Sequence, residues 1–392
     1  MKIVLALPTL LAKNDDVIFA PRNLFIELVN GLVDKGHDVS VIAPLNVKTR
    51  GKSIEFDRIL EKETISSIKD QNAEDIFKKE LTYWKDRIEY ELLLTCEAFK
   101  FAEENHCELV HIYLGYQSHY IAEIAKTPSV FAMHDPVFPE KTLEYHLLTK
   151  FSNHNYIAIS QSQSKRYEES LSIKSRDVVY HGIDPSDFVF SDKNPEKLAF
   201  IARFVPEKGA EDALIVAREL GKKIKIVSSE NYKKIPYYKN VLKPLMSSNV
   251  EESPFLKRPD ELSRFYGDAK ATLFPIKWDE SFGMVMIESM SCGTPVIAYA
   301  EGSVPEVIKD GETGFIIDRV SSDGQRKIKE TGIEGLKKAT EKIYQMSDKD
   351  YSQMRRACRK RVEENFTLEK MVDGYEKVYR QVIENYKKHS TG

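Results

Sequence analysis

Short apolar runs that read as β-strands alternate with helical patterns along the chain, and this alternation occurs in two successive series. Each run is rich in β-branched or apolar residues and is closed by polar or turn residues. Strand–helix alternation is typical of a parallel sheet with helices on both faces. The runs of the first series are Lys2–Pro8, Val39–Pro44, Glu108–Tyr113, Ser129–His134, Tyr156–Ser160 and Val178–Tyr180, and those of the second are Lys197–Ile201, Ile224–Val227, Ala271–Pro275, Pro295–Ala298 and Gly314–Ile317. Two series in 392 residues predict an α/β chain of two domains.

A polar stretch with several helix and strand breakers separates the two series. It begins at His181-Gly182-Ile183-Asp184-Pro185 and continues through Ser191 to Lys197. Domain boundaries fall in exposed, breaker-rich segments of this kind, so we place the linker at 185–196. The first domain is then expected to cover 1–188 and the second 189–367.

Two helical segments need separate treatment. Residues 46–106 are highly charged and mostly helical in pattern, and we interpret them as an elaboration of the first domain. An apolar stripe in this segment is expected to face a core and not a ligand; its members are Ile76, Phe77, Leu81, Trp84, Ile88 and Leu92. A last helix is expected to begin near Thr367, whose hydroxyl can cap it. The apolar face that this helix is expected to bury consists of Met371, Tyr375, Val378, Tyr379 and Val382.

Charge and composition argue against several classes of function. A formal net charge of -3 gives no electrostatic reason to expect nucleic acid or a polyanion as partner. The four cysteines show no C-x-x-C pair and no metal-ligand spacing, which indicates reduced and mostly buried thiols in a cytosolic protein. No apolar run approaches the roughly 18 residues of a membrane span. A cytoplasmic location is therefore expected, with a peripheral position at the inner face of the membrane as a variant.

Two short segments resemble membrane signals only superficially. Residues 1–12 could pass for a short signal peptide, but a first buried strand is the better interpretation, because cleavage would leave the run at Val39–Pro44 without its neighbour. Lys48, Arg50 and Lys52 form a small basic loop that could touch a membrane or a phosphorylated acceptor. Such loops are usually only solvated.

The segment Asp279–Met284 carries the pattern that says most about function. It follows the apolar run Leu273–Pro275 and opens a helix that carries Glu288. A helix N-terminus offers unpaired N–H groups and the positive end of a dipole, and Gly283 lets a ligand approach the backbone closely. Carboxylates such as Glu280 and Glu288 accept hydrogen bonds from vicinal hydroxyls. The segment therefore suits a ligand with hydroxyls at both ends and phosphates in the middle, which is the layout of a nucleotide sugar.

A second loop supplies cations for such a ligand. Ala202–Gly209 follows the first strand of the second series and contains Arg203 and Lys208. Both side chains are suited to neutralise a diphosphate. Open α/β sheets bind ligands outside the carboxyl ends of their parallel strands, so this loop and the Glu280 segment are expected to meet at one edge of the second sheet.

The spacing of Glu280 and Glu288, and the residues around them, resemble a known family. The two glutamates lie in E-S-F-G-M-V-M-I-E-S-M-S-C-G-T-P-V-I-A, which resembles the E-x7-E signature of the family-four retaining glycosyltransferases. Further stretches similar to that family are Gly302–Ile308, Gly311–Phe315, Arg203–Gly209, Ile159-Ser160 and Gly36–Val39. The resemblance spans nearly the whole chain and is most specific over 271–318.

The resemblance implies a GT-B architecture, in which two Rossmann-like domains face each other across a central cleft. It implies that the C-terminal domain, 189–367, binds a nucleotide-sugar donor such as a UDP- or GDP-sugar, and that the N-terminal domain binds the acceptor. The last helix would return to the first domain, so that this domain comprises 1–188 plus 368–392. No cofactor and no metal ion is implied, because arginine, lysine and helix dipoles stabilise the leaving diphosphate.

The resemblance also implies roles for the residues of the E-x7-E segment. Glu280 would hold hydroxyls of the transferred sugar, and Glu288 would hold the ribose. Phe282, Gly283 and Met284 would offer backbone amides to the donor. The reaction implied is transfer of a hexose-type sugar from a nucleotide diphosphate to an acceptor hydroxyl, with retention at the anomeric carbon.

Further roles fall on cations and on a histidine. Arg203 and Lys208 would grip the phosphates, and a histidine near the sugar is usual in the family. His134, at the end of the run Ser129–His134, is the candidate for that histidine, whereas His111 is expected to be structural. The residues expected to be catalytic are thus Glu280, Arg203, Lys208 and His134.

One departure from the family keeps alternatives open. The loop after the first strand often carries a Gly-Gly pair, whereas the matching positions here are Phe19 and Ala20, followed by Pro21 and Arg22. Side chains restrict close approach of a ligand to the backbone, so either the loop sits back or Arg22 replaces the amides with a charged contact. A nucleotide-sugar binding protein without transferase activity is therefore one alternative, and a nucleotide-sugar epimerase on the same fold is another. The acceptor could be a glycan, a lipid-linked molecule or a small molecule.

Overall fold

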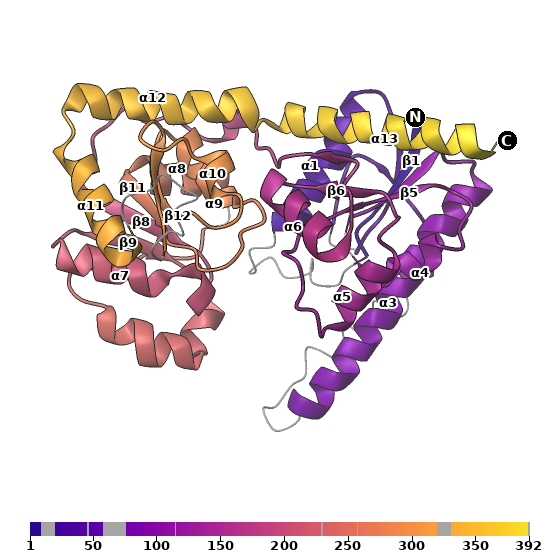
Figure 1. The fold of residues 1–392 in the computed structure, drawn as a ribbon, viewed down its shortest axis with the longest axis horizontal. Coiled ribbons are helices and arrows are strands. Elements are labelled where there is room, and N and C mark those ends of the chain that lie inside the picture. Colours follow the sequence, from indigo (N-terminus) through magenta and orange to yellow (C-terminus); the bar gives the residue numbers. More distant parts are fainter. Residues whose placement is uncertain are drawn as a thin grey trace.

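The chain folds into two lobes, each built around one parallel β-sheet (Figure 1). The computed structural model describes residues 1–8, 20–44, 47–57, 76–113, 115–228, 230–256, 258–319 and 331–390. The N-terminal lobe contains the first series of strands and the C-terminal lobe contains the second. The predicted α/β architecture with two parallel sheets is confirmed.

The sheet of the N-terminal lobe has seven strands in the order β3-β2-β1-β4-β5-β6-β7. All paired neighbours are parallel, and the order runs outward in both directions from the adjacent strands β1 and β4. Such a reversal of strand order is a topological switch point, where ligands bind in open α/β sheets. The strands are β1 Lys2–Ala6, β2 Asp38–Ile42, β3 Lys52–Ser53, β4 Leu109–Ile112, β5 Ser129–Ala132, β6 Tyr156–Ala158 and β7 Asp177–Val178.

Alternate residues of the buried strands belong to two separate hydrophobic cores in this lobe. Ile3 and Leu5 of β1 join one cluster with side chains of α1 and α13, while Val4 and Ala6 join a second cluster with side chains of α3. This follows from the period of two in a strand, which sends successive side chains to opposite faces. The helices of the lobe are α1 Ala20–Asp34, α3 Ile76–Glu104, α4 Ser118–Ala122, α5 Leu143–Lys150, α6 Gln161–Leu171 and α13 Leu368–Ser390.

The sheet of the C-terminal lobe has six parallel strands in the order β10-β9-β8-β11-β12-β13. Its switch point lies between the neighbours β8 and β11. The strands are β8 Lys197–Ile201, β9 Ile224–Val227, β10 Val250–Glu252, β11 Ala269–Phe274, β12 Val296–Tyr299 and β13 Gly314–Ile317. The helices are α7 Ala210–Glu219, α8 Pro259–Gly267, α9 Met284–Ser291, α10 Val304–Val307, α11 Gly332–Gln345 and α12 Asp348–Asn365, with short turns η3 Pro185–Asp187, η4 Pro206–Lys208, η5 Glu230–Lys234, η6 Tyr238–Leu242 and η7 Lys243–Leu245.

Two strands were not predicted from the sequence. β3 consists of Lys52 and Ser53, both exposed, and β10 consists of Val250, Glu251 and Glu252, of which both glutamates are exposed. Each pairs with one neighbour only and lies at the edge of its sheet. Because such strands bury little apolar surface, they lack the apolar run on which strand prediction depends.

The predicted apolar stripe of residues 76–92 needs correction. The helix itself is present as α3, but Ile88 is 40 % exposed. The buried face of the helix instead includes Tyr90, Leu94 and Ala98. Tyr90 lies two residues beyond Ile88, or about 200° around the helix. The stripe was therefore assigned to the wrong face at Ile88; the side chains of residues 76–87 lie outside the described part of the chain.

The two helices α12 and α13 join the lobes. They follow each other along the top of the molecule in Figure 1, α12 over the C-terminal lobe and α13 over the N-terminal lobe. Thr367 caps α13, since its Oγ1 accepts from the amide of Lys370 at 3.3 Å. The predicted apolar face of α13 is confirmed, because all of its members are at most 3 % exposed: Met371, Tyr375, Val378, Tyr379 and Val382.

The linker packs against the junction of α12 and α13, where the chain crosses from one lobe to the other. The amide of Ile183 donates to the carbonyl of Phe366 at 3.0 Å, and the amide of Leu368 donates to the carbonyl of Ile183 at 2.9 Å. A Cβ on Gly182 would lie 2.2 Å from the carbonyl oxygen of Thr367, so the two crossing segments can approach this closely only because position 182 is glycine.

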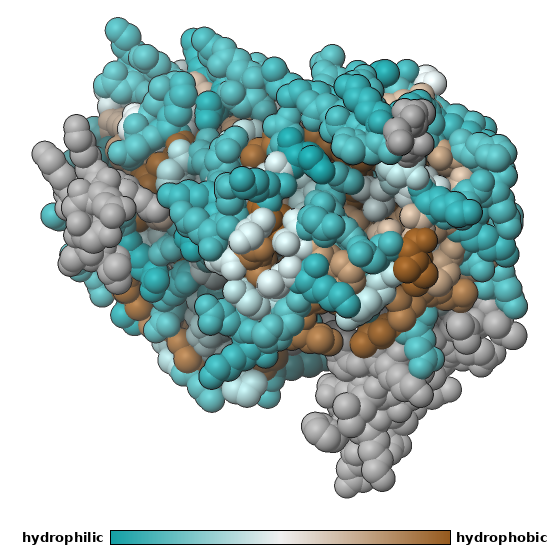
Figure 2. All heavy atoms as spheres, turned by 45° about the vertical axis from the view of Figure 1, so that its right-hand side comes forward, coloured by the Kyte–Doolittle hydropathy of each residue, from teal (hydrophilic) through white to brown (hydrophobic). Residues whose placement is uncertain are grey.

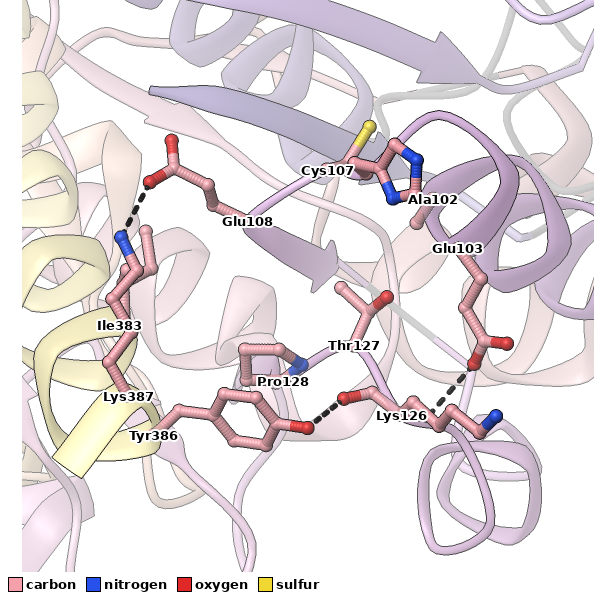
Figure 3. Close-up of a pocket in the computed structure, with 11 residues that line it drawn as sticks. Ala102, Glu103, Cys107, Glu108, Lys126, Thr127, Pro128, Ile383, Tyr386 and Lys387 are labelled. Carbon is pink, nitrogen blue, oxygen red and sulfur yellow. Dashed lines mark hydrogen bonds and ion pairs between the residues drawn. The ribbon is translucent and has the colours of Figure 1, made fainter. Parts of the chain in front are cut away.

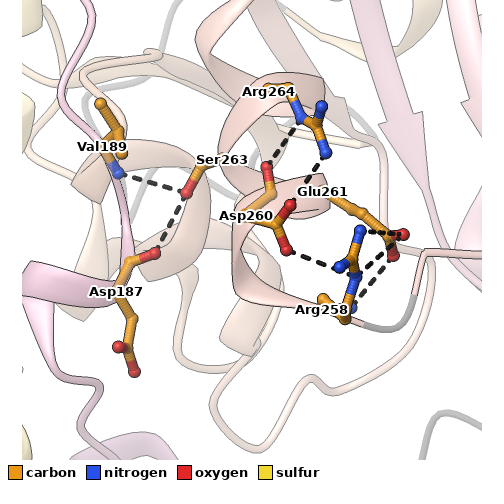
Figure 4. Close-up of polar contacts among 7 residues, drawn as sticks. All are labelled: Asp187, Val189, Arg258, Asp260, Glu261, Ser263 and Arg264. Carbon is orange, nitrogen blue, oxygen red and sulfur yellow. Dashed lines mark hydrogen bonds and ion pairs between the residues drawn. The ribbon is translucent and has the colours of Figure 1, made fainter.

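The linker is also hydrogen-bonded to Ser263 in the middle of α8, as Figure 4 shows. Ser263 receives the amide of Val189 at 3.2 Å and donates to the carbonyl of Asp187 at 3.2 Å. The first turn of α8 is stabilised in turn by the Glu261 carboxylate, which accepts from the amide of Arg258 at 3.2 Å. These contacts attach the linker firmly to the C-terminal lobe from residue 187 onward.

A fully buried arginine holds α12 against the C-terminal sheet. The Arg355 guanidinium donates to the carbonyls of Ser191 at 2.6 Å, Gly267 at 3.3 Å, Ala269 at 3.3 Å and Cys292 at 3.4 Å. It also donates to the Tyr351 hydroxyl at 2.8 Å. No carboxylate lies within ion-pair distance of Arg355 among the residues that the structure describes. Four backbone carbonyls and the Tyr351 hydroxyl therefore compensate this buried charge.

The surface is mostly hydrophilic on the face drawn in Figure 2, where hydrophobic residues gather in separate groups. Within the described ranges, no helix combines the length and the apolar character that crossing a membrane requires. All four cysteines are free thiols, and only Cys96 is exposed, which confirms the expectation of unpaired and mostly buried thiols.

Candidate active site

Two loops meet at the carboxyl edge of β8 and β11, the switch point of the C-terminal sheet. The first loop runs from Ala202 to Lys208, and the second, here called the Glu280 loop, covers 275–283. The amide of Lys277 donates to the carbonyl of Glu207 at 2.7 Å. Gly209 has a φ of +72°, and a Cβ there would lie 1.9 Å from the carbonyl oxygen of Pro275. Glycine is thus required where the two loops touch.

Lys208 and Glu280 form an ion pair between these loops. The Nζ atom of Lys208 lies 2.9 Å from Oε2 of Glu280, and the two side chains are only 14 % and 11 % exposed. The indole N–H of Trp278 donates to the same oxygen at 2.8 Å. The Lys208 ammonium also lies 4.3 Å from the centroid of the Trp278 ring, within cation–π range. Oε1 of Glu280 has no hydrogen bond to any residue in the described ranges.

The Glu280 loop is fixed from behind by the segment that precedes α10. The amide of Ser303 donates to the carbonyl of Glu280 at 2.9 Å, and its hydroxyl donates to the carbonyl of Phe282 at 2.8 Å. A Cβ on Gly302 would lie 2.1 Å from the carbonyl oxygen of Glu280. The loop and the start of α10 therefore form one packed unit.

Gly283 ends the loop in a left-handed conformation with φ +82° and begins α9. A Cβ there would lie 2.7 Å from Cε of Met286 and 3.3 Å from Cγ of Glu280. Phe282 is buried, and Met284 is half-buried at the first position of the helix. The structure thus places these predicted donor contacts at a helix N-terminus beside Glu280, where N–H groups and the dipole favour an anion.

Glu288 lies within α9, and a tyrosine hydroxyl donates a hydrogen bond to its carboxylate. The Tyr266 hydroxyl donates to Oε2 of Glu288 at 3.0 Å. Burial raises the pKa of the Glu288 carboxyl, and the Tyr266 hydrogen bond opposes this shift. Glu280 thus precedes α9 and Glu288 lies within it, with Tyr266 as a partner that the spacing did not reveal.

Arg203 differs from Lys208 in its surroundings. Its side chain is exposed, and it makes no ion pair or hydrogen bond with any residue that the structure describes. It belongs to the loop after β8 but is not brought into the Lys208–Glu280 pair. Arg203 is thus available to an anion at this edge of the sheet without breaking an existing contact.

His134 lies across from the Glu280 loop, beyond the end of β5. Its ring stacks on that of His181 with centroids 5.3 Å apart, and His181 meets the Phe282 ring edge-on at 5.2 Å. Both His134 ring nitrogens are buried and lack a hydrogen-bond partner within the described residues. Burial lowers the pKa of His134 to about 3, so the imidazole is neutral near pH 7. The rings of His134, His181 and Phe282 therefore form a continuous contact from one lobe to the other.

His111 is held by a contact with the last helix. It is fully buried, and its Nδ1 lies 2.6 Å from the Tyr379 hydroxyl of α13. Burial lowers its pKa to about 3. His111 therefore joins β4 to the last helix.

Two segments of the N-terminal lobe were expected to be relevant to a ligand: the loop after the first strand and the small basic loop. Phe19 lies outside the described residues, and Ala20 to Arg22 form the first turn of α1. In the basic loop, Arg50 pairs with Asp34 and Lys52 pairs with Asp38 at 2.7 Å. These two cations are therefore engaged within the protein.

The described residues contain no group of three or more metal-ligating side chains.

A hollow of about 470 Å³ lies at the opposite, amino end of β4 and β5, between those strands and α13. Figure 3 shows its lining, with Lys387 paired to Glu108 at 3.1 Å and Tyr386 donating to the carbonyl of Lys126. Since open α/β sheets bind ligands at their carboxyl edges, this hollow is separate from the candidate site.

Sequence reasoning missed several residues of the site. Trp278 and Tyr266 each hold one of the predicted glutamates, and His181 connects His134 to Phe282. Trp278 stands two residues before Glu280, which was a usable signal. No comparable signal pointed to Tyr266, because it reaches Glu288 only through the packing of α8 on α9.

Part of the chain matches a known family model, and the chain is similar in sequence to several known proteins. Residues 186–348 match the family model described as glycosyl transferases group 1. An uncharacterized glycosyltransferase of Methanocaldococcus jannaschii is 23% identical over 294 residues, which are 71% of this chain and 77% of that protein. The N-acetyl-alpha-D-glucosaminyl L-malate synthase of Bacillus anthracis is 29% identical over 154 residues, so the match spans 39% of this chain and only 37% of that relative.

Solved structures resemble the whole chain. The sucrose-phosphate synthase of Thermosynechococcus elongatus has a TM-score of 0.72 at 16% identity, with 98% of this chain and 100% of that chain covered. Anabaena HepE in complex with UDP-glucose has a TM-score of 0.64 at 14% identity, with 99% and 100% covered. The chain therefore has the GT-B fold of these solved structures, and its residues 186–348 match the group 1 glycosyl transferase model.

Proposed function

We propose that the protein is a retaining glycosyltransferase that moves a hexose-type sugar from a nucleotide diphosphate to an acceptor hydroxyl without a metal ion. The observation that carries this proposal is the ion pair of Lys208 and Glu280 at the N-terminus of α9. It combines, in one place, an acceptor for sugar hydroxyls, a cation for the diphosphate and a helix dipole that favours the anion. The HepE structure contains UDP-glucose, which supports a UDP-sugar as the first donor to test.

The sugar, the ribose and the diphosphate of the donor then each have a partner. Oε1 of Glu280 is available to sugar hydroxyls, while Lys208 and Trp278 hold Oε2 in place. Glu288 receives the ribose hydroxyls. Arg203, exposed at the same edge, joins Lys208 on the diphosphate.

The chemistry follows from this placement. The bond from the anomeric carbon to the diphosphate oxygen breaks, and the developing charge on the leaving group is stabilised by Lys208, Arg203 and the start of α9. The leaving phosphate accepts the proton of the acceptor hydroxyl, which forms the new bond on the same face. His134, kept neutral by burial, offers hydrogen bonds but no charge on the acceptor side of the site. Contact between the lobes excludes water and suppresses hydrolysis of the donor.

The function is tested by release of nucleoside diphosphate from a panel of UDP- and GDP-sugars, with glycan, lipid-linked and small-molecule acceptors. We expect release that depends on an acceptor, is lost in Glu280→Ala and persists in EDTA. Binding of a donor without turnover on any acceptor would indicate a binding protein. Conversion of the donor without an acceptor would indicate an epimerase, and loss of release in EDTA would contradict the metal-free mechanism.

The two glutamates should affect different parts of the donor. Glu288→Ala is expected to weaken binding of free UDP or GDP by about tenfold or more, because a charge-assisted contact to the ribose is lost. Glu280→Ala is expected to weaken binding of the intact sugar donor and to leave the affinity for the free diphosphate nearly unchanged. Isothermal titration calorimetry measures both affinities. Glu312→Ala, an exposed change in the same lobe, is the control, and equal losses in both glutamate variants would contradict the division of roles.

A further inference from the structure

Helix α6 of the N-terminal lobe is held by a carboxylate from the other lobe. Glu306, on α10, accepts from the amides of Gln161 at 2.7 Å and Ser162 at 2.6 Å. It also accepts from the Tyr180 hydroxyl at 2.9 Å. Within α6, the Ser160 side chain accepts from the amide of Gln163 at 3.1 Å. The first three N–H groups of α6 are thus all satisfied, two of them by a residue from across the interface.

A second contact joins the same helix to the Glu280 loop. Nε of Arg166, in the second turn of α6, lies 2.9 Å from Oδ2 of Asp279. Asp279 is the residue immediately before Glu280. Helix α6 therefore reaches the C-terminal lobe at two points, one with its N-terminus and one with a side chain.

Both points belong to the packed unit that positions Glu280. Ser303 binds the carbonyls of Glu280 and Phe282, and α10 begins at the next residue. The Arg361 side chain of α12 donates to the carbonyl of Glu306 at 2.7 Å. Two direct contacts therefore connect the position of α6 to Glu280.

We propose that Glu306 and Arg166 are positioning residues, which clamp α6 to the Glu280 loop and so set both the spacing of the lobes and the orientation of Glu280 for transfer. The consequence for catalysis rests on the proposed function. The nucleotide contacts proposed above lie within the C-terminal lobe and do not involve this clamp. Its loss should therefore affect the rate of transfer and leave nucleotide binding unaffected.

The chain offers closely matched controls. Lys165 is the neighbour of Arg166 on α6, is 75 % exposed and pairs only weakly with Glu169 at 3.7 Å. Glu312 is an exposed glutamate near Glu306 in sequence and pairs with Lys309 at 3.5 Å. Lys165→Ala and Glu312→Gln remove the same kinds of charge without touching the interface between the lobes.

Four variants test the clamp: Glu306→Ala, Glu306→Gln, Arg166→Ala and the double variant Glu306→Ala/Arg166→Ala. We expect Glu306→Ala and Arg166→Ala to lower kcat by about 10-fold to 100-fold, because small misplacements of reacting groups have effects of this size. The Kd of UDP or GDP should stay at the value of the controls. Glu306→Gln keeps one acceptor oxygen for the α6 amides and should retain more activity than Glu306→Ala. Small-angle X-ray scattering should show a larger radius of gyration in the double variant than in the controls.

The outcomes separate this inference from the proposed function. Wild-type kcat in both single alanine variants, or a radius of gyration of the double variant equal to that of the controls, would overturn the clamp. A loss of UDP or GDP affinity as large as the loss of kcat would also overturn it, since that would show local damage to the C-terminal lobe. If the wild-type protein turns over no donor, the proposed function fails, and the scattering comparison alone then decides whether the clamp holds the lobes together.

Discussion

Replacement of Lys208 by alanine is expected to lower kcat by about 100-fold or more, because removal of one preorganised group that stabilises a leaving anion has effects of this size. The position of Lys208 supports such a large effect. Its ammonium is only 14 % exposed, is 2.9 Å from Glu280 and lies over the Trp278 ring at 4.3 Å. The charge is therefore already oriented before the diphosphate leaves, so little rearrangement is needed during the reaction.

Single-turnover kinetics on the donor identified by the panel measure this effect directly. Glu280 keeps the indole N–H of Trp278 as a partner in the Lys208→Ala variant, which limits indirect damage to the loop. Lys208→Arg retains the charge and should recover part of the rate. Lys239→Ala, an exposed change in the same lobe, should leave the rate unchanged. Normal turnover in Lys208→Ala would exclude the role in leaving-group stabilisation.

Replacement of Arg355 by methionine is expected to lower the free energy of unfolding by about 3 kcal/mol, since each buried carbonyl left without a donor costs about 1–3 kcal/mol. The carbonyls of Ser191 and Gly267 have no other donor among the described residues. Removing a buried charge recovers some desolvation energy, but here that charge is compensated by four carbonyls. For a lobe of this size, the loss corresponds to a fall in Tm of about 6–12 °C.

Thermal and urea unfolding, followed by circular dichroism, test this prediction. Arg356 is the adjacent residue on α12 and pairs at the surface with Asp192 at 2.8 Å, with its side chain 69 % exposed. Arg356→Met should therefore change the stability by no more than about 0.5 kcal/mol. Equal stability of the two variants would show that the buried guanidinium contributes nothing beyond a surface ion pair.

The sequence was sufficient for the buried strands of both sheets and for the meeting of two loops at the edge of the C-terminal sheet. Buried parallel strands are continuous apolar runs, so β8 and β11 could be recognised locally. Once these strands are parallel neighbours, their following loops must meet, and this brings Lys208 close to Glu280. The edge strands β3 and β10 were not predicted because they bury little apolar surface: Lys52, Ser53, Glu251 and Glu252 are all exposed.

Contacts between the lobes could not be predicted in the same way. Glu306 was recognised as part of a family-like stretch, but its partners are backbone amides of α6, which have no sequence signature. The stacking of His134 on His181 depends likewise on how the linker leaves β7. Local patterns determine which residues end a strand, whereas the relative position of two domains determines which of those residues face each other.

The return of α13 to the N-terminal lobe has a consequence for how the protein is made. The sheet of the C-terminal lobe uses only residues 197–317. The N-terminal core, in contrast, packs Leu5 and Val41 together with Tyr375 and Val378 of α13. On the ribosome, domains generally fold as units, with the N-terminal one first. Here the first lobe to be synthesised cannot complete its core until α13 has emerged, so the lobe that is translated second can be the first to finish folding.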